Sequence, residues 1–209
     1  MSHTFKNGPR LFHGLDIALA AGDRLCLKGA NGSGKTTLLK IFSGLVIPSA
    51  GEVNYCNLPI FKLPLKMKSQ ISFMPAAKSG MFANLSGIEN INFFASLVGL
   101  GHAQLDEKLK SWCEFDLFQK SLKTPFYLCS TGMKSCLLLF KSMLSNPRVL
   151  ILDEPLTNLD ANVTDFFKQA IKKGNDDMLV IYSSHQQDLI FDGEEQLLTL
   201  AEASSANSH

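Results

Sequence analysis

The chain has 209 residues, of which 45% are hydrophobic and 19% are charged, as expected for one globular domain with a substantial core. Its formal net charge is +1 and its lysines and arginines form no basic tract, which argues against nucleic acid as a partner. No apolar run approaches the ~20 residues that a membrane-spanning helix needs, and five cysteines without a C-x-x-C pair favour reduced thiols over a metal site.

The amino-terminal part of the chain predicts a strand, a glycine-rich loop and a helix. DRLCLKG (23–29) is a short apolar run that ends in glycine, which is typical of a buried strand. The following NGSGKTTLLKIFSG predicts a loop and a helix of about ten residues, closed by Gly44. A turn at Pro48 and Gly51 then leads into another strand, and residues 1–20 are expected to add short antiparallel strands.

The middle of the chain is predominantly helical. Residues 60–84 are irregular and rich in lysine, whereas SGIE (86–89) is a capping box that begins an apolar helix. The segment 105–118 predicts another helix, and a third is expected to start near Gly132 and run through LLLFKSML. We therefore expect a helical subdomain at about residues 80–145, inserted into the rest of the domain.

The carboxyl-terminal part alternates strand, helix and strand. RVLILD (148–153) and MLVIYSSH (178–185) are apolar strands, and DANVTDFFKQAIKKG (160–174) is a helix with an aspartate cap and a closing glycine. This alternation at both ends predicts an α/β fold with a mostly parallel central sheet and flanking helices. We expect residues 1–200 to form a single domain and residues 201–209 to be a disordered tail.

The segment GANGSGKT (29–36) fits the phosphate-binding pattern G-x-x-x-x-G-K-[ST], with a strand before it and a helix after it. Glycines let successive N–H groups point at an anion, and the helix N-terminus adds partial positive charge. Lys35 can then reach the β- and γ-phosphates, and Thr36 can hold Mg²⁺. A glycine-rich turn without a ligand is the alternative, which the strand–loop–helix context disfavours. The predicted nucleotide-binding residues here are Gly29, Asn31, Gly32, Ser33, Gly34, Lys35, Thr36 and Thr37.

Two carboxylates end the strand RVLILDEP, at the sheet edge where ligands of parallel α/β folds bind. Asp153 is expected to join the Mg²⁺ shell, and Glu154 is placed to accept a proton from an attacking water. His185 ends the next apolar strand at the same edge, where contact with the γ-phosphate is expected. The alternatives are a strand-to-turn exit for Asp-Glu-Pro and a structural or solvated histidine.

Five motifs in order resemble the ATP-binding subunits of ABC transporters over about residues 4–200: the phosphate loop, CSTGMKS (129–135), VLILDEP, LTNLD and SSHQ. The resemblance implies a P-loop NTPase fold of the ABC type and an ATPase that needs ATP and Mg²⁺. CSTGMKS is similar to the family signature LSGGQ, with Ser130 and Gly132 kept. Two subunits of that family pack head to tail, so Ser130 and the Gly132 N–H are expected to bind the γ-phosphate of a second copy. The alternative is a plain helix cap.

Other positions follow from the same resemblance. Leu159 and Asp160 correspond to the loop that crosses the dimer interface, and Phe5 to the aromatic that stacks on adenine, although a core role is equally compatible with Phe5. The family has a glutamine near ISFMPAAKSG that contacts Mg²⁺ and the attacking water. This chain has Ala76 and Ala77 there, and the nearest glutamine, Gln70, is expected in the preceding strand.

The chain resembles most the heme-exporter ATPases of cytochrome c maturation, which act with separate integral membrane subunits at the cytoplasmic face of the bacterial inner membrane. The alternatives are the ATPase of another small exporter, for a lipid, polysaccharide or drug, and a slow or non-hydrolysing nucleotide-binding regulator. An ABC ATPase acting on DNA or ribosomes is disfavoured, because 209 residues hold neither long coiled coils nor tandem domains. We expect membrane docking through residues 78–100, chiefly through Met81, Phe82 and Leu85.

Overall fold

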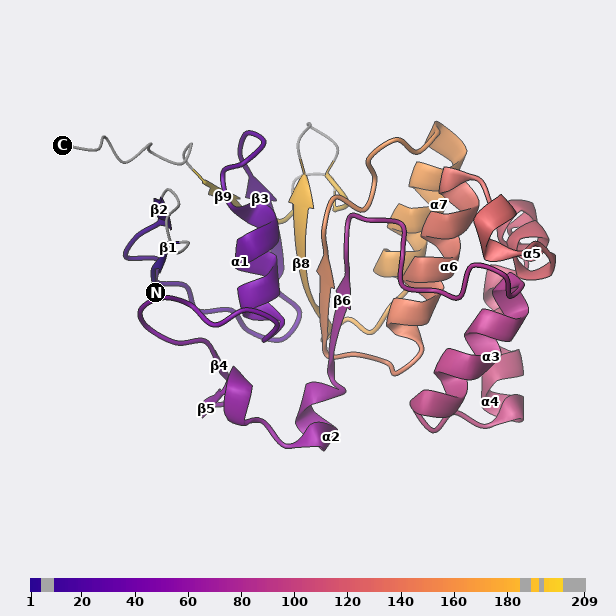
Figure 1. Ribbon diagram of the computed structural model, residues 1–209, viewed down its shortest axis with the longest axis horizontal. Coiled ribbons are helices and arrows are strands. Elements are labelled where there is room, and N and C mark those ends of the chain that lie inside the picture. Colours follow the sequence, from indigo (N-terminus) through magenta and orange to yellow (C-terminus); the bar gives the residue numbers. More distant parts are fainter. Residues whose placement is uncertain (5–9, 185–188, 192–193, 201–209) are drawn as a thin grey trace.

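The computed structural model describes residues 1–4, 10–184, 189–191 and 194–200. A parallel sheet of five strands lies at its centre, in the order β6-β7-β8-β3-β9 (Figure 1). This arrangement confirms the predicted α/β fold with a mostly parallel sheet. The strands are β3 (Arg24–Lys28), β6 (Ile71–Met74), β7 (Val149–Leu152), β8 (Leu179–Ser184) and β9 (Gln196–Thr199).

Two small antiparallel sheets accompany the central one. β1 (His3–Thr4) pairs with β2 (Arg10–Phe12), which confirms the antiparallel strands expected near the amino terminus. The strand expected after Gly51 is β4 (Asn54–Tyr55), which is only 2 residues long and forms a hairpin with β5 (Leu58–Pro59).

The helices α3 to α6 gather at one end of the central sheet, whereas α1 lies near the other end (Figure 1). The single helix predicted over 105–118 is wrong, because the chain forms two helices there. Trp112 and Phe115, at the break between them, both pack on the ring of Phe166. The helices are α1 (Lys35–Phe42), α2 (Leu65–Lys68), α3 (Gly87–Leu97), α4 (His102–Trp112), α5 (Asp116–Lys123), α6 (Thr131–Met143) and α7 (Ala161–Lys172), with 3-10 turns η1 (Ile60–Lys62) and η2 (Phe126–Leu128).

The central sheet separates two hydrophobic cores. Successive side chains of a strand point to opposite faces, so in β7 Leu150 and Leu152 join the core shared with α6 and α7, whereas Val149 and Ile151 join the core shared with α1. All four residues are buried. Burial on both faces explains why this strand is a continuous apolar run rather than an alternating one. The boundaries of a separate helical subdomain stay a prediction.

A buried asparagine fixes the loop that leads into α3. The side chain of Asn90 is fully buried, and its Oδ1 accepts the Phe82 N–H at 2.7 Å. Its amide nitrogen donates to the carbonyls of Phe82 and Leu85 at 3.0 and 3.2 Å. The predicted capping box is present, since the Ser86 N–H donates to Glu89 and the Ser86 hydroxyl accepts from the Glu89 N–H. The loop before α3 is thereby held in one conformation.

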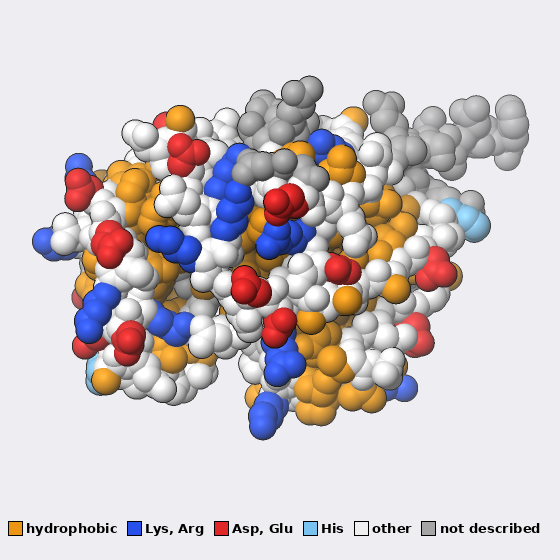
Figure 2. All heavy atoms as spheres, turned by 180° about the vertical axis from the view of Figure 1, so that it is seen from behind, with side chains coloured by type: hydrophobic (Ala, Val, Ile, Leu, Met, Phe, Trp, Pro, Cys, Tyr) orange, Lys and Arg blue, Asp and Glu red, His pale blue; other side chains and the backbone are white. Residues whose placement is uncertain are grey.

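The surface carries both signs of charge. Figure 2 shows basic and acidic side chains interspersed over one face, without a large region of a single sign. In the part of the chain that the structure describes, no helix combines the length and hydrophobicity that a membrane crossing requires.

Candidate functional site

The phosphate loop connects the carboxyl end of β3 to the start of α1, as the sequence predicts. Gly34 caps the helix with φ 97°, a left-handed conformation that other residues adopt only with strain. Gly29 has φ 152°, and a Cβ there would lie 2.6 Å from Ser33 Oγ and 2.8 Å from the Leu200 carbonyl. Both positions therefore require glycine. Of the other predicted residues in the loop, Asn31 and Gly32 are exposed at its tip, Ser33 is buried, and Thr37 is half-buried in the first turn of α1.

Lys35 lies with its ammonium inside the loop. Its Nζ donates hydrogen bonds to the carbonyls of Gly29 and Ala30 at 2.7 and 3.0 Å, and the residue is only 4% exposed. Burial lowers the pKa of Lys35, and the carboxylates of Glu154 and Asp153 oppose that shift. The loop thus holds a cation beside two anions, at the place where the sequence predicts phosphates.

Asp153 joins three elements of the site. It follows β7 and is 1% exposed. Its Oδ2 accepts the hydroxyl of Thr36 from α1 at 2.8 Å, and its Oδ1 accepts the hydroxyl of Ser183 from β8 at 2.8 Å. Its own N–H donates to the Met74 carbonyl at the end of β6, at 2.9 Å. A buried carboxylate is tolerated only when hydrogen bonds replace its hydration, and here they come from Thr36 of α1 and Ser183 of β8.

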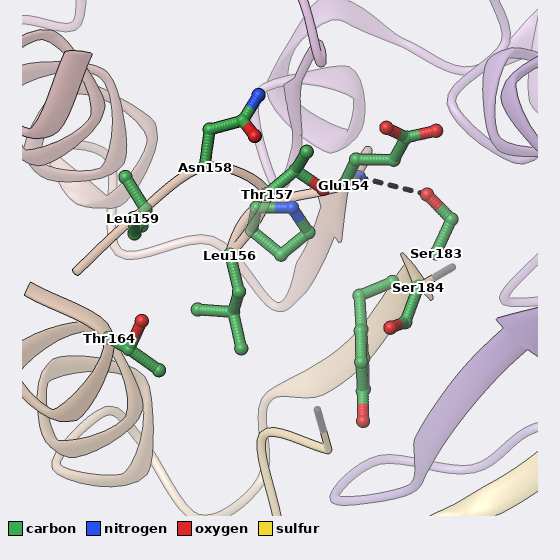
Figure 3. A pocket seen from close by; sticks show the side chains of 10 residues that line it. Glu154, Leu156, Thr157, Asn158, Leu159, Thr164, Ser183 and Ser184 are labelled. Atoms are coloured by element: carbon green, nitrogen blue, oxygen red, sulfur yellow. Dashed lines mark hydrogen bonds between the residues drawn. The ribbon is translucent and has the colours of Figure 1, made fainter. Parts of the chain in front are cut away.

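The next residue, Glu154, has a strained backbone. Its φ is 50°, in the left-handed region that is rare for a residue with a side chain. Its N–H donates to Ser183 Oγ at 2.9 Å, so one serine hydroxyl serves both acidic residues (Figure 3). Glu154 lines a cavity of about 310 Å³ together with residues 155–159, Thr164 and the end of β8. In Figure 3 its carboxylate points away from Leu156 and Thr164, out of the turn that carries it.

Thr36 and Asp153 fit Mg²⁺. Their oxygens are 2.8 Å apart, and Mg²⁺ prefers oxygen ligands, of which the protein usually supplies one or two beside phosphates and water. Among the described residues no group of three or more His, Cys, Asp or Glu could form an all-protein metal cage. A Mg²⁺ ion at Thr36 and Asp153 would take its other ligands from phosphate and water.

The signature segment begins helix α6. Ser130 is its N-cap, exposed to solvent, and its hydroxyl accepts the Met133 N–H at 3.3 Å. Gly132 is packed, since a Cβ there would lie 3.2 Å from Val163 and 3.3 Å from Leu117. Close packing against these two side chains is therefore a second reason, besides the predicted phosphate binding, for a glycine at this position. α6 and α1 pack on opposite faces of the central sheet, α6 in the core with Leu150 and Leu152 and α1 in the core with Val149 and Ile151.

The loop that leads to α7 has an ordered end. Asp160 is the N-cap of α7, and its carboxylate accepts the Val163 N–H at 3.0 Å, which confirms the predicted aspartate cap. Asn158 has φ 59° and its side chain points to the same side as that of Glu154 (Figure 3). Leu159 is half-buried against the core shared with α6 and α7. The turn is therefore held at its start by β8, in its middle by the packing of Leu159, and at its end by the cap of α7.

Two expectations about the segment 70–85 are wrong. Gln70 lies in the turn before β6, where its carbonyl accepts the N–H groups of Arg148 and Val149 and its side chain accepts the Tyr55 hydroxyl. It is thus at the end of the strand opposite to Asp153. Met81, which the sequence predicts to be exposed in the loop before α3, lies in that loop but is half-buried against the core shared with α6 and α7. Phe82 and Leu85 are 48% and 36% exposed, in line with the prediction.

Several predicted positions lie outside the described residues, namely Phe5, His185 and the tail 201–209. One residue of the site was missed by sequence reasoning, although a signal existed. Ser183 belongs to the pair of serines that ends β8, directly before the predicted site residue His185.

The comparisons with known proteins agree on one protein family. The family model described as ABC transporter matches residues 12–157. The cytochrome c biogenesis ATP-binding export protein CcmA of Cupriavidus necator is 34% identical over 161 residues, which cover 77% of this chain and 70% of that protein. The Nod factor export ATP-binding protein I of Cupriavidus metallidurans is 29% identical over 158 residues, 76% of this chain and 52% of that protein. A dimeric bacterial ABC transporter cassette matches 97% of this chain and 92% of its own, with a TM-score of 0.83 and 21% identity.

The first prediction tests the shared serine. Replacing Ser183 by alanine leaves the Glu154 N–H without its acceptor and removes one of the donors to the buried Asp153 carboxylate. We expect the free energy of unfolding to fall by about 2 kcal/mol, measured by urea unfolding with the fluorescence of Trp112, the only tryptophan.

The matched control is Ser142→Ala. Ser142 is also buried, but its hydroxyl makes one hydrogen bond, to the Leu138 carbonyl one helical turn away. Its loss should cost about 1 kcal/mol or less. Equal losses in the two variants would contradict the role assigned to Ser183.

Proposed function

Because this chain belongs to the ABC transporter family, we propose that it is the ATP-hydrolysing subunit of a membrane export complex. One observation carries the catalytic part of the proposal. The hydrogen bonds of Asp153 to Thr36 and Ser183 bring the acidic end of β7 against the helix that follows the phosphate loop. This arrangement puts a cation, a candidate Mg²⁺ site and a candidate base, Glu154, at one edge of the sheet.

The proposed reaction is hydrolysis of the γ-phosphate. The oxygen of a water molecule attacks the γ-phosphorus, the bond from this phosphorus to the β–γ bridging oxygen breaks, and ADP and phosphate leave. Glu154 accepts one proton of the attacking water and later returns it to solvent. Its N–H bond to Ser183 holds the strained turn that presents the carboxylate. Residues 29–37 bind the phosphates of ATP, with the N–H groups of the loop and the start of α1 as donors.

Charge compensation comes from two sources. Lys35, now bonded to the loop carbonyls of Gly29 and Ala30, is placed to turn its ammonium to the β- and γ-phosphates. Thr36 and Asp153 would hold Mg²⁺, which supplies positive charge to the phosphate oxygens when it is bound. His185 is proposed to contact the γ-phosphate and Phe5 the adenine.

We propose a dimer in which the signature of each copy completes the ATP site of the other. Ser130 is exposed at a helix N-terminus, where the partial positive charge favours an anion. The helix that it caps, α6, packs on the opposite face of the sheet from α1, the helix that follows its own phosphate loop. A phosphate held by a second copy is therefore the anion that it can reach, with Leu159 and Asp160 at the interface.

The proposed docking surface for separate integral membrane subunits is an exposed apolar patch on α3 and the loop before it. We call it the α3 patch, and it consists of Phe82, Leu85, Phe93, Leu97 and Val98. The exposed fractions range from 36% for Leu85 to 67% for Leu97. Phe82 packs edge to face on Phe93 at 4.9 Å, so the patch is continuous across the loop and the helix. Such a patch is typical of an interface, and it would hold the chain peripherally at the cytoplasmic face of the inner membrane.

For the cargo we propose heme, delivered for cytochrome c maturation. The support is the similarity to the cytochrome c biogenesis export protein, at 34% identity. The second candidate is another small export system, supported by the Nod factor export protein at 29% identity. The third is a slow or non-hydrolysing regulator, suggested by Ala76 and Ala77 at the position where the family has a glutamine.

The second prediction tests the base. Glu154→Gln removes the proton acceptor and keeps the size of the side chain, so ATP binding should stay at the parental level. Hydrolysis should fall by ~10²- to 10⁴-fold, measured as phosphate release by the purified chain. Parental phosphate release by this variant would show that Glu154 is not the base.

The same variant separates the candidate cargoes. In cells that depend on this chain, heme export requires that Glu154→Gln abolish covalent heme on c-type cytochromes, measured by heme staining. Normal cytochromes alongside a lost ATPase would point to another cargo.

The third prediction tests shared sites. Ser130→Asp keeps a good helix cap but places a negative charge against the partner's γ-phosphate, and Lys35→Ala disables the phosphate loop. Each variant alone should be inactive. In an equal mixture half of the dimers are mixed and have one intact site of two, so about a quarter of the parental activity should return. Mixed dimers without activity would exclude sharing between copies.

The fourth prediction tests the α3 patch. Phe82→Asp places a charge in the patch, so we expect normal ATP binding in solution and loss of co-purification with membranes that contain the partner subunits. The matched control is Ile47→Asp, which changes a residue that is 69% exposed in the loop after α1. Membrane recovery of both variants at the parental level would place the docking surface elsewhere.

A further inference from the structure

The loop that follows β6 leaves the sheet beside the two acidic residues of the site. β6 pairs with β7 and ends at Met74, whose carbonyl accepts the Asp153 N–H at 2.9 Å. Four residues later the loop reaches Lys78. The Ser79 N–H donates to the Ala77 carbonyl at 2.7 Å, which forms a tight turn around Lys78. The backbone of this loop is therefore close to the site and locally ordered.

A second lysine holds the far side of the same loop. Lys141 of α6 donates through its Nζ to the Gly80 carbonyl at 2.8 Å, and its ammonium lies 4.1 Å from the ring centroid of Phe94. Lys78 is thus held between the end of β6 and an anchor on α6. The backbone on both sides of Lys78 is thereby fixed.

The ammonium of Lys78 is buried and has no hydrogen-bond partner among the described residues. A buried cation without a partner is costly, so it needs an explanation, and a role at a functional site is one. Burial lowers the pKa of Lys78, and interactions with Cys136 and Glu154 oppose the shift. The Cys136 thiol is neutral at physiological pH, because burial raises its pKa to about 12. Of these two groups, Glu154 is thus the one with a carboxylate that can attract the ammonium.

Glu154 acts on Lys35 as well, through the same kind of charge interaction. The candidate base therefore lies within electrostatic reach of two lysines, one in the phosphate loop and one in the loop after β6. A phosphate group bound beside Glu154 would therefore meet positive charge from both loops.

We propose that Lys78 is a catalytic residue whose Nζ donates a hydrogen bond to the γ-phosphate of ATP, in the absence of the glutamine that the family usually has in this loop. The proposal rests on the proposed ATPase function. Lys78 keeps its protons throughout the reaction, while the water proton goes to Glu154 as described above. Its charge stabilises the γ-phosphate oxygens as the bond to the bridging oxygen breaks. Because ADP lacks that phosphate, Lys78 should favour ATP over ADP.

The test compares Lys78→Met with the parental chain. Methionine has a similar length and no charge, so it removes the unpaired ammonium without opening a cavity. We expect the affinity for a non-hydrolysable ATP analogue to fall by ~10-fold and the affinity for ADP to stay unchanged. The kcat for ATP should fall by ~10²-fold. Urea unfolding should show a stability that is equal or higher, because a buried unpaired charge is gone.

Two further variants sharpen the result. Lys78→Gln can still donate a hydrogen bond, so its kcat and its preference for ATP should lie between those of the parent and Lys78→Met. Lys66→Met changes an exposed lysine of α2 and should alter none of these quantities.

Three outcomes would overturn the proposal. The first is an unchanged ratio of ATP to ADP affinity in Lys78→Met. The second is an equal fall of both affinities together with a lower stability, which indicates a structural lysine. The third is a rise in kcat, which indicates that Lys78 restrains Glu154. If the parental chain itself fails to hydrolyse ATP, the proposed function is wrong. The ratio of the affinities for ATP and ADP still decides whether Lys78 contacts the γ-phosphate.

Discussion

The buried carboxylate of Asp153 is the constraint on which the site depends. It has too little contact with water to be hydrated, so the protein must supply its hydrogen bonds. Those bonds come from Thr36 on α1 and Ser183 on β8, two segments far apart in the sequence. One charge therefore fixes the phosphate loop helix, the acidic strand and the neighbouring strand relative to one another. Loss of any partner should disturb all three at once, because the network is shared.

The strain at Glu154 has a compensation in the same network. A left-handed backbone conformation at a residue with a side chain costs of order 1–3 kcal/mol and persists only where the surroundings impose it. Here the N–H of that residue is bonded to Ser183, and the preceding residue is held on both sides. The cavity beside the turn leaves room around the carboxylate. The strained backbone of Glu154 thus lowers the local stability at the position from which the candidate base projects from the sheet.

The sequence predicts what depends on local patterns. Continuous apolar runs predict β3, β7 and β8, and the glycines with Lys35 predict the phosphate loop, because each pattern has few other solutions. The helix break near Cys113 was not predictable, since it depends on aromatic packing against α7. β9 was missed because its QLLT segment is short and largely exposed. The hydrogen bond of Ser183 to Glu154 and the charge interaction of Lys78 with Glu154 depend on the fold, because no spacing in the sequence encodes them.

The cap of α6 has a consequence for the cost of association. A serine hydroxyl has two acceptor lone pairs and one proton to donate. Ser130 uses a lone pair to accept the Met133 N–H, which fixes its rotamer and leaves its proton available for an outside acceptor. The group that would meet a second copy's nucleotide is therefore already ordered in the single subunit. Less conformational entropy remains to be lost when the two copies close, so more of the binding energy of ATP is left to hold them together.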